Sequence, residues 1–350
     1  MSEHYAGRQI VGMDLHRRRS VLVRMTDTGE QLETIRISND PEYLKAVMAR
    51  AGEAPEVVLE AAYGWYWAAD TLAELGATVH LAHPLGVKMF SYRRVKNDQR
   101  DAADLADLLR MGRLPEAWIA PPATRELRGW VRHRAKLVGL RSSLKCQVHG
   151  VLAHAGVWVP MSDLFGVAGQ QLLAGDTELS TGQRLSVESR SRLDSALRVI
   201  GALEFEIELF AKLVNGRLRT DSGYRTIQQI PGVGRLLAAV FVAEIGDITR
   251  FHRPEQLASW AGLTPKHHES DTTVHRGRIT KQGSRLVRWA AVEAVQRVPA
   301  HTRLGQRRDQ IGERRGRNIG VVAAARDLVT LVFYGLRDHH LRCLPTKAAA

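Results

Sequence analysis

Residues 9–38 read QIVGMDLHRRRSVLVRMTDTGEQLETIRIS, and this stretch indicates the fold of the N-terminal part of the chain. Its β-branched runs are separated by short polar stretches, which is typical of a β-meander. Further along, PEVVLEAA predicts a strand over 56–61, residues 66–75 a helix, and ATVHLAHP another strand. Consecutive strands followed by alternating strands and helices predict an α/β layer.

The next helix is predicted by residues 96–109, KNDQRDAADLADLL, which place an aspartate at every third position: Asp98, Asp101, Asp104 and Asp107. Each residue of a helix advances by about 100°, so the four carboxylates cannot share one ion. The apolar residues of this helix form a stripe that includes the direction of Asp98 and is flanked by Asp101. We therefore expect these two acids to face the interior and the other two to face water.

Two further acids stand where apolar residues would be less costly: Asp14 within IVGMDL and Glu60 at the end of VVLE. A carboxylate turned toward a core is unfavourable unless it is paired or ligated, and Mg²⁺ is bound by carboxylate oxygens. Asp14, Glu60, Asp98 and Asp101 are therefore expected to converge on two Mg²⁺ ions, although Mn²⁺ accepts the same ligands. The alternative, in which Asp98 caps the helix and Asp101 meets its dipole, leaves Asp14 and Glu60 unexplained.

From residue 126 to about residue 220 the pattern changes to that of long helices. Apolar residues recur every seven positions in two series, which predicts a coiled-coil seam: Trp130, Leu137, Leu144 and Val151, then Leu193, Ile200, Ile207 and Val214. Residues 159–189 between them are expected to form a loop or a short helix. The seam is compatible with a hairpin within one chain and with assembly of subunits.

The last third of the chain contains a glycine-rich turn and a dense run of basic residues. IPGVG at 230–234 predicts a helix-hairpin-helix in which Gly232 and Gly234 bring backbone N–H groups close to a phosphate. A glycine turn without any ligand is the alternative. The residues that we expect to contact nucleic acid after it are Arg276, Arg278, Lys281, Arg285 and Arg288.

The composition agrees with a nucleic-acid partner. The 350 residues carry a net charge of +13, and phosphate neutralisation supplies much of the affinity for nucleic acid. A merely solvated basic face is the alternative. The sequence shows no secretory signal and no apolar run that approaches a membrane span, so we expect a cytoplasmic protein with no membrane partner. Cys146 and Cys343 have no metal-binding or disulfide spacing and are expected to be ordinary thiols.

Ser270 lies in the polar and basic stretch LTPKHHESDTTVHRGRITKQGSRLVR, residues 263–288. A serine hydroxyl needs a base or a metal to act as a nucleophile, and Glu269, His267, His268 or the metals of the acidic domain could serve. Most serines in polar loops are only solvated, so the residue pattern alone does not favour catalysis. The histidines here lack the spacing of a zinc site.

Together these motifs resemble the IS-one-ten (IS110) family of insertion-sequence transposases over nearly the whole chain. The family pattern K-x-D-x-x-D-A stands at 96–102, and Asp14 in GMDL and Glu60 in VLEA match the first aspartate and the glutamate of the family. The C-terminal signature comprises IPGVG, AGLTP at 261–265, Ser270 five residues later and GRITKQGSRLVRW at 277–289. The family usually has Gly where this chain has Asp271, and Asn where it has Ser284.

The resemblance implies three regions. They are an α/β RuvC-like (RNase H-like) DEDD domain over 1–125, a helical coiled-coil region over 126–220, and a mostly α C-terminal transposase domain over 221–345 with a helix-hairpin-helix and a catalytic serine. A homo-oligomer, either a dimer or a tetramer, is expected because the acidic and serine domains are separated by the long helices. A bacterial cytoplasmic enzyme of this kind would associate with the nucleoid when active.

The resemblance also implies a mechanism, in which Ser270 attacks a phosphodiester of donor or target DNA and becomes covalently attached to it. Asp14, Glu60, Asp98 and Asp101 would hold Mg²⁺, and the basic residues would hold the strands. An element-encoded bridge RNA would pair with both DNAs. Two alternatives stay open: a metal-dependent nuclease or junction resolvase that uses water, and a nucleic-acid-binding scaffold without chemistry.

Overall fold

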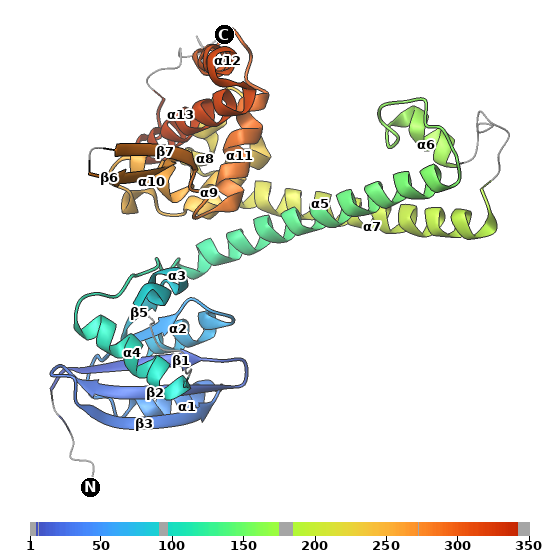
Figure 1. The fold of residues 1–350 in the computed structure, drawn as a ribbon. Coiled ribbons are helices and arrows are strands. Elements are labelled where there is room, and N and C mark those ends of the chain that lie inside the picture. The colour runs from blue at the N-terminus through green and yellow to red at the C-terminus, as the bar shows by residue number, and fades with distance from the viewer. Residues whose placement is uncertain (1–4, 6, 91–96, 175–184, 272, 342–350) are drawn as a thin grey trace. The chain divides into compact units, whose positions relative to one another are not determined.

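The computed structural model describes residues 5, 7–90, 97–174, 185–271 and 273–341, with the backbone alone at 274 and 276. Lys96, Cys343 and the Arg276 side chain, which the sequence analysis singled out, lie outside this description. The chain forms two compact units, Met1–Ala120 and Pro121–Ala350. Figure 1 shows the elements of each unit.

A five-stranded mixed sheet forms the centre of the N-terminal unit, in the order β3-β2-β1-β4-β5. Antiparallel pairing joins β1 to β2 and β2 to β3, whereas β4 is parallel to both β1 and β5. The predicted meander and the two later strands are thus confirmed. The strands are β1 (Gln9–Leu15), β2 (Arg19–Thr26), β3 (Gln31–Ser38), β4 (Glu56–Glu60) and β5 (Thr78–Ala82).

Helices cover both faces of this sheet (Figure 1). Side chains alternate between the faces of a strand, so Val11 and Met13 of β1 face helices α1 and α2, whereas Ile10 faces helix α4. The sequence analysis did not predict α1. The helices of this unit are α1 (Pro41–Met48), α2 (Trp65–Glu74), α3 (Pro84–Val87) and α4 (Asp98–Arg110), with a 3₁₀ turn η1 (Lys88–Phe90).

Helix α4 packs very close to β1 because residue 12 has no side chain. A Cβ atom at Gly12 would lie 1.8 Å from the carbonyl oxygen of Ala102. Ala102 and Ala106 of α4 are fully buried at this contact, and their small side chains permit the close approach. Gly12 therefore sets the distance between the helix and the strand.

Two long helices dominate the first part of the C-terminal unit, α5 (Pro122–His154) and α7 (Val187–Leu218). They run side by side (Figure 1). The predicted heptad residues of α7, Leu193, Ile200, Ile207 and Val214, are all buried. Helix α6 (Val167–Ala174) packs at one end of the pair, within the stretch where a loop or a short helix was expected. Subunit assembly through these helices stays a prediction.

The remaining elements form a second core around helix α13. Phe333 of α13 and Phe241 of α9 are fully buried in it. The elements are α8 (Ser222–Ile227), α9 (Arg235–Ile245), η2 (Ile248–Arg250), α10 (Pro254–Trp260), β6 (Pro265–Ser270), β7 (Thr273–Ile279), α11 (Arg285–Gln296), α12 (Arg303–Arg315) and α13 (Arg317–Asp338).

The expectation of a polar loop around Ser270 was wrong, because β6 and β7 pair as an antiparallel hairpin. Every residue of β6 is exposed, so the hairpin lacks the alternation of apolar and polar residues by which a half-buried strand is recognised. Backbone hydrogen bonds rather than a buried face hold it together.

Among the described helices, α13 alone is long and apolar enough to cross a membrane by length and composition, contrary to the expectation that no segment approaches a span. Half of its most apolar stretch is buried inside the unit, as in the core helix of a globular fold. The apolar composition of α13 is thus accounted for by packing against α8, α10, α11 and α12.

We expect Gly12→Val to destabilise the N-terminal unit by at least about 2 kcal/mol, because the new side chain must displace α4 from β1. Chemical denaturation followed by circular dichroism measures this change. Gly129→Ala is the control, since Gly129 lies in α5 with open space around it and should change stability by less than about 1 kcal/mol. An equally small effect of Gly12→Val would contradict the packing argument.

Candidate active site

The pairing of two parallel strands brings two of the predicted acids to one edge of the sheet. Met13 of β1 is in register with Leu59 of β4, so Asp14 and Glu60 are the next residues along each strand. Asp14 shares the face of Gly12, and Glu60 shares the face of Val58, which packs with α4. Both acids are therefore on the side of the sheet that α4 covers.

Helix α4 contributes the other two acids from its first turn. Its N-cap is Asn97, whose Oδ1 accepts a hydrogen bond from the backbone N–H of Gln99. The alternative in which Asp98 caps the helix is therefore wrong. Asp98 and Asp101 are half-buried, Asp104 is exposed, and Asp107 accepts two hydrogen bonds from Arg110.

Side chains of β1, the following turn and α4 meet closely at this edge. His16 Nε2 lies 3.1 Å from Asp14 Oδ2 and 3.4 Å from Asp98 Oδ1. Ligand atoms of Asp14, His16 and Asp98 all fall within 4.8 Å of one another. Arg19 Nη2 lies 3.7 Å from Asp98 Oδ2. We call Asp14, Glu60, Asp98 and Asp101 the acidic centre.

The electrostatics of Asp14 show that the other acids surround it. Burial is the main cause that raises the pKa of Asp14 above its usual value. The positive end of His16 partly offsets this, while the charges of Asp101, Asp98 and Glu60 raise the pKa of Asp14 further. Glu60 and Asp101 thus act on Asp14 through charge and lie outside the tightest cluster, which comprises Asp14, His16 and Asp98.

The acidic centre has the properties of a divalent-metal site. Asp14 Oδ2 is buried and has no hydrogen-bond partner among the described residues, because the nearby His16 ring is not aligned to donate to it. Repelling carboxylates with an unsatisfied buried oxygen favour a bound cation, and oxygen ligands are those that Mg²⁺ and Mn²⁺ prefer. The residues present therefore fit such an ion.

Sequence reasoning missed His16 and Arg19, which lie beside the acids. The available signal was the alternation of β1, since Gly12, Asp14 and His16 are spaced by two and share one face. His16 lies just beyond the end of β1 and was read only as part of a polar connection. Its position next to Asp14 and Asp98 makes it part of the site.

In the C-terminal unit, Ser270 is the last residue of β6 and pairs with Thr273 of β7. His268 pairs with His275 two residues earlier, so it shares the strand face of Ser270. Glu269 and His267 are on the opposite face, where their side chains lie 3.1 Å apart. Of the three neighbours considered as a base, His268 is thus the one on the side of the serine.

The two departures from the family pattern have structural explanations. Asp271, in place of Gly, has a φ of 51°, the left-handed conformation that Gly adopts freely and Asp tolerates better than most residues. Ser284, in place of Asn, is the N-cap of α11, and its Oγ accepts a hydrogen bond from the Val287 N–H. Serine and asparagine are both strong N-caps, so this function is preserved.

The predicted nucleic-acid contacts differ in their surroundings. Arg278, Lys281 and Arg285 are exposed. Arg288 instead donates hydrogen bonds to the carbonyl oxygens of Ala261 and Gln282, and burial lowers its pKa. Arg288 therefore holds the start of α11 to the preceding loop, and the exposed three have side chains free to reach a phosphate.

The glycines of IPGVG have separate structural roles. Gly232 has a φ of 86°, and a Cβ there would lie 2.3 Å from the carbonyl oxygen of Ala294 in α11. Packing against α11 thus accounts for Gly232. Gly234 is exposed and forms the N-cap of α9. Phosphate binding at this turn stays a prediction.

A buried acid, Glu244 of α9, fastens the long helix α5 to the C-terminal core. Both Glu244 oxygens accept hydrogen bonds from Arg132, at 2.7 and 3.0 Å, and Oε2 also accepts one from Ser284 Oγ at 3.1 Å. Arg128 donates to the carbonyl oxygens of Ala243 and Glu244. The same carboxylate therefore links α5, α9 and the start of α11.

Comparisons with known proteins agree with these observations. The model of the transposase family IS116/IS110/IS902 matches residues 224–310, and the model of the DEDD transposase domain of IS110 elements matches residues 11–156. The chain belongs to this family of transposases. Its C-terminal core and its acidic centre both lie within the matched segments.

Several curated relatives share this assignment. A probable family 20 transposase of Pseudomonas aeruginosa is 27% identical over 236 residues, which cover 67% of this chain and 68% of that protein. The transposase for insertion sequence element IS1111A of Coxiella burnetii is 24% identical over 347 residues, with coverage of 96% and 92%. The pilin gene-inverting protein of Moraxella bovis is 26% identical over 236 residues, with coverage of 60% and 71%.

Among solved structures, T. thermophilus RuvC in complex with a Holliday junction substrate matches with a TM-score of 0.24 and 17% identity, over 31% of this transposase and 99% of RuvC. A likeness this weak carries no conclusion about fold or function. The assignment as a transposase of insertion sequences, which acts on DNA, rests on the family models and the curated relatives.

We expect Asp14→Asn to stabilise the metal-free transposase at pH 7. The pKa of Asp14 is raised in the folded state, so its charge destabilises the fold above that pKa and has no such effect below the unfolded-state value. The gain should therefore shrink as the pH falls toward about 4. Thermal unfolding with a chelator present measures it.

Adding Mg²⁺ to the same samples should raise the unfolding temperature of the wild type more than that of Asp14→Asn, because the ion binds only the folded state. Asp104→Asn, an exposed acid on the same helix, serves as the control and should behave like the wild type. Equal Mg²⁺ responses of all three proteins would argue against a cation site at Asp14.

We expect Arg132→Ala to destabilise the C-terminal unit by about 2–3 kcal/mol, because it leaves the Glu244 carboxylate buried with Ser284 as its remaining side-chain donor. This is near or below the range for fully buried pairs, since the Arg132 side chain is 49% exposed. The double variant Arg132→Met/Glu244→Gln should recover part of the loss in urea denaturation. No recovery would indicate that Arg132 stabilises the unit by packing alone.

Proposed function

We propose that this transposase is a DNA recombinase that cuts and rejoins strands through a covalent link to Ser270, with metal ions held by Asp14, Glu60, Asp98 and Asp101. The observation that carries the metal part is the convergence of the acidic centre on a buried Asp14 oxygen without a hydrogen-bond partner among the described residues. We propose that the N-terminal unit has the RuvC-like architecture that the family resemblance implies.

The acids would bind Mg²⁺, or Mn²⁺, at the edge of the sheet where β1 and β4 end. When bound, such an ion supplies positive charge to a phosphate that gains negative charge during cleavage. His16 and Arg19 support the same ligands from outside, because His16 lies beside Asp14 and Asp98 and Arg19 beside Asp98. Their positive charge also offsets repulsion among the carboxylates.

The serine step conserves phosphodiester bonds. Ser270 Oγ forms a bond to phosphorus while the bond from phosphorus to one strand oxygen breaks, and that oxygen leaves with a proton as a hydroxyl. Attack by the hydroxyl of another strand reverses the step and frees Ser270, so no ATP is consumed. His268 is the proposed acceptor of the serine proton, because it shares the strand face of Ser270.

Two features support nucleic-acid binding around this serine. The hairpin of β6 and β7 is exposed, and Arg278, Lys281 and Arg285 follow the serine on exposed positions. The whole chain carries a net charge of +13. We propose that part of this charge binds donor and target DNA and part binds an element-encoded bridge RNA, with a dimer or a tetramer as the working unit.

A metal-dependent nuclease that uses water is the second candidate function. It is favoured by one observation: Ser270 has no hydrogen bond among the described side chains, whereas the acidic centre is assembled. In that case the acids alone cut DNA, and the serine is a solvated residue at a hairpin tip.

The deciding experiment incubates the purified transposase with donor DNA, target DNA, Mg²⁺ and RNA transcribed from the flanks of its element, then separates the products on denaturing gels. We expect a protein–DNA adduct that requires Mg²⁺ and disappears in Ser270→Ala. Asp14→Asn and Asp98→Asn should each reduce adduct formation by more than about a hundredfold, since a lost ligand exceeds the effect of a lost outer-sphere partner.

Ser259→Ala is the matched control, because Ser259 is a second exposed serine of the same unit and should leave the adduct unchanged. DNA cleavage that survives Ser270→Ala without any adduct would replace the serine proposal by the nuclease. Adduct formation without added RNA would contradict the RNA part alone.

A further inference from the structure

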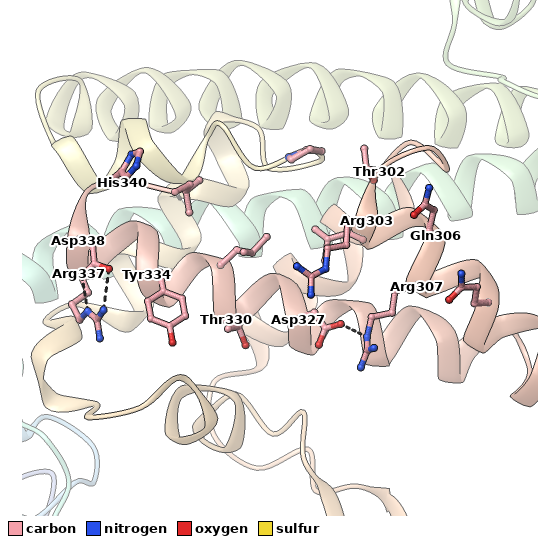
Figure 2. Close-up of a pocket in the computed structure, with 15 residues that line it drawn as sticks. Thr302, Arg303, Gln306, Arg307, Asp327, Thr330, Tyr334, Arg337, Asp338 and His340 are labelled. Atoms are coloured by element: carbon pink, nitrogen blue, oxygen red, sulfur yellow. Dashed lines mark hydrogen bonds and ion pairs between the residues drawn. The ribbon is translucent and has the colours of Figure 1, made fainter. Parts of the chain in front are cut away.

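A groove of about 820 Å³ lies between the first half of α12 and the second half of α13, outside the acidic centre and the serine hairpin (Figure 2). It is large enough for a small organic ligand or a nucleotide. Both helices turn polar residues into it. They are Arg303, Gln306, Arg307 and Gln310 of α12, and Asp327, Thr330, Tyr334, Arg337 and Asp338 of α13.

The spacing of these residues shows that the groove is built by two whole helix faces. Positions 303, 306, 307 and 310 recur at three or four residues on α12, and positions 327, 330, 334 and 337 do so on α13. Neighbouring helices ordinarily bury apolar side chains between such faces. Here the faces that meet are polar, so the helices leave a groove instead of closing on a core.

The helices do close at the other end of the pair. A Cβ at Gly320 of α13 would lie 2.2 Å from the carbonyl oxygen of Arg308 and 2.8 Å from the backbone nitrogen of Gly312. This contact is near Gly316, where α12 ends and α13 begins. The groove therefore occupies the open end of a tightly joined helical hairpin, and its walls are held in place.

The charges in the groove suit a phosphate. Figure 2 shows Arg303 and Arg307 close to Asp327, and an ion pair joins Arg307 to Asp327. Asp327 is half-buried, and burial raises its pKa although Arg307, Arg326 and Arg303 all lower it. Three arginines thus surround one carboxylate, which leaves positive charge available to an added anion.

The aromatic ring in the groove suits a base. Tyr334 is 37% exposed, and the Arg337 guanidinium carbon lies 4.9 Å from the centre of its ring. Arg337 is held there by two hydrogen bonds to Asp338, at 2.6 and 2.9 Å. An exposed ring next to a fixed guanidinium is the combination on which unpaired bases stack.

We propose that this groove binds one unstacked nucleotide of a single-stranded nucleic acid, with the base on Tyr334 and the phosphate at Arg303 and Arg307. The carboxylate of Asp327 would accept a hydrogen bond from a base N–H, as acidic side chains do from cytosine N4. A duplex cannot occupy the groove in this way, because its bases are stacked on one another. The inference rests on the proposed function in so far as cutting and exchanging strands exposes single-stranded segments.

The test measures binding of oligomers roughly ten nucleotides long by fluorescence anisotropy, with a chelator present so that no DNA is cut. We expect Tyr334→Ala to weaken single-strand binding about tenfold, Tyr334→Phe to retain it, and duplex binding to change less than about twofold. Tyr43→Ala, an exposed tyrosine of α1, is the control and should leave both affinities unchanged.

Arg303→Ala should reduce the dependence of log K on log salt for single strands by about 0.7, which corresponds to one phosphate contact. Single-stranded DNA and RNA are measured in parallel, and the tighter of the two identifies the strand that the groove holds. Equal losses of duplex and single-strand affinity in Tyr334→Ala, or no loss in either, would overturn the proposal.

A second measurement on the wild type avoids any folding defect of the variants. Single strands that carry 5-iodouracil should cross-link on irradiation to the peptide containing Tyr334, as mapped by mass spectrometry. Cross-links confined to other peptides would overturn the proposal. If cross-linking at Tyr334 is found while no Ser270 adduct forms, the proposed function fails and the groove stands; the reverse result leaves the serine chemistry and removes the groove.

Discussion

The close approach of helix α4 to strand β1 is the constraint on which the N-terminal unit depends. It exists because residue 12 has no Cβ and because Ala102 is small. The same approach brings the first turn of α4 over the ends of β1 and β4, so the packing that stabilises the sheet also forces Asp98 and Asp101 toward Asp14. Stability and the acidic centre are thus consequences of one contact, and the cost of crowding like charges is borne by the hydrophobic packing around it.

The C-terminal unit reaches a comparable result by other means. Glu244 is a buried carboxylate fully occupied by Arg132 and Ser284, whereas Asp14 is a buried carboxylate with an unsatisfied oxygen. The first arrangement fixes elements in place, and the second leaves an interaction to be completed by a cation. The two acids illustrate that burial of a charge indicates a ligand site only where the local donors fall short.

Much of the N-terminal unit was predictable because its signals are local. The strands around Asp14 and Glu60 and the inward face of α4 follow from periodicity, and the acids follow from their cost in apolar strands. His16 was missed because its importance depends on the register of a neighbouring element. The hairpin that carries Ser270 was missed for a different reason, since neither face is buried and backbone pairing leaves no hydrophobic pattern. The cap at Asn97 was missed because Asp98 is an equally good capping residue.

The paired helices α5 and α7 have a geometric property that follows from their seven-residue repeat. A helix of 33 residues such as α5 is about 50 Å long, comparable to some fifteen base pairs of B-form DNA. Inserting seven residues into each helix would lengthen the pair by about 10 Å while every buried position kept its partner, whereas an insertion of two or three would rotate the buried residues into water. The reach of this arm can therefore change only in discrete steps, which makes it a ruler with fixed graduations.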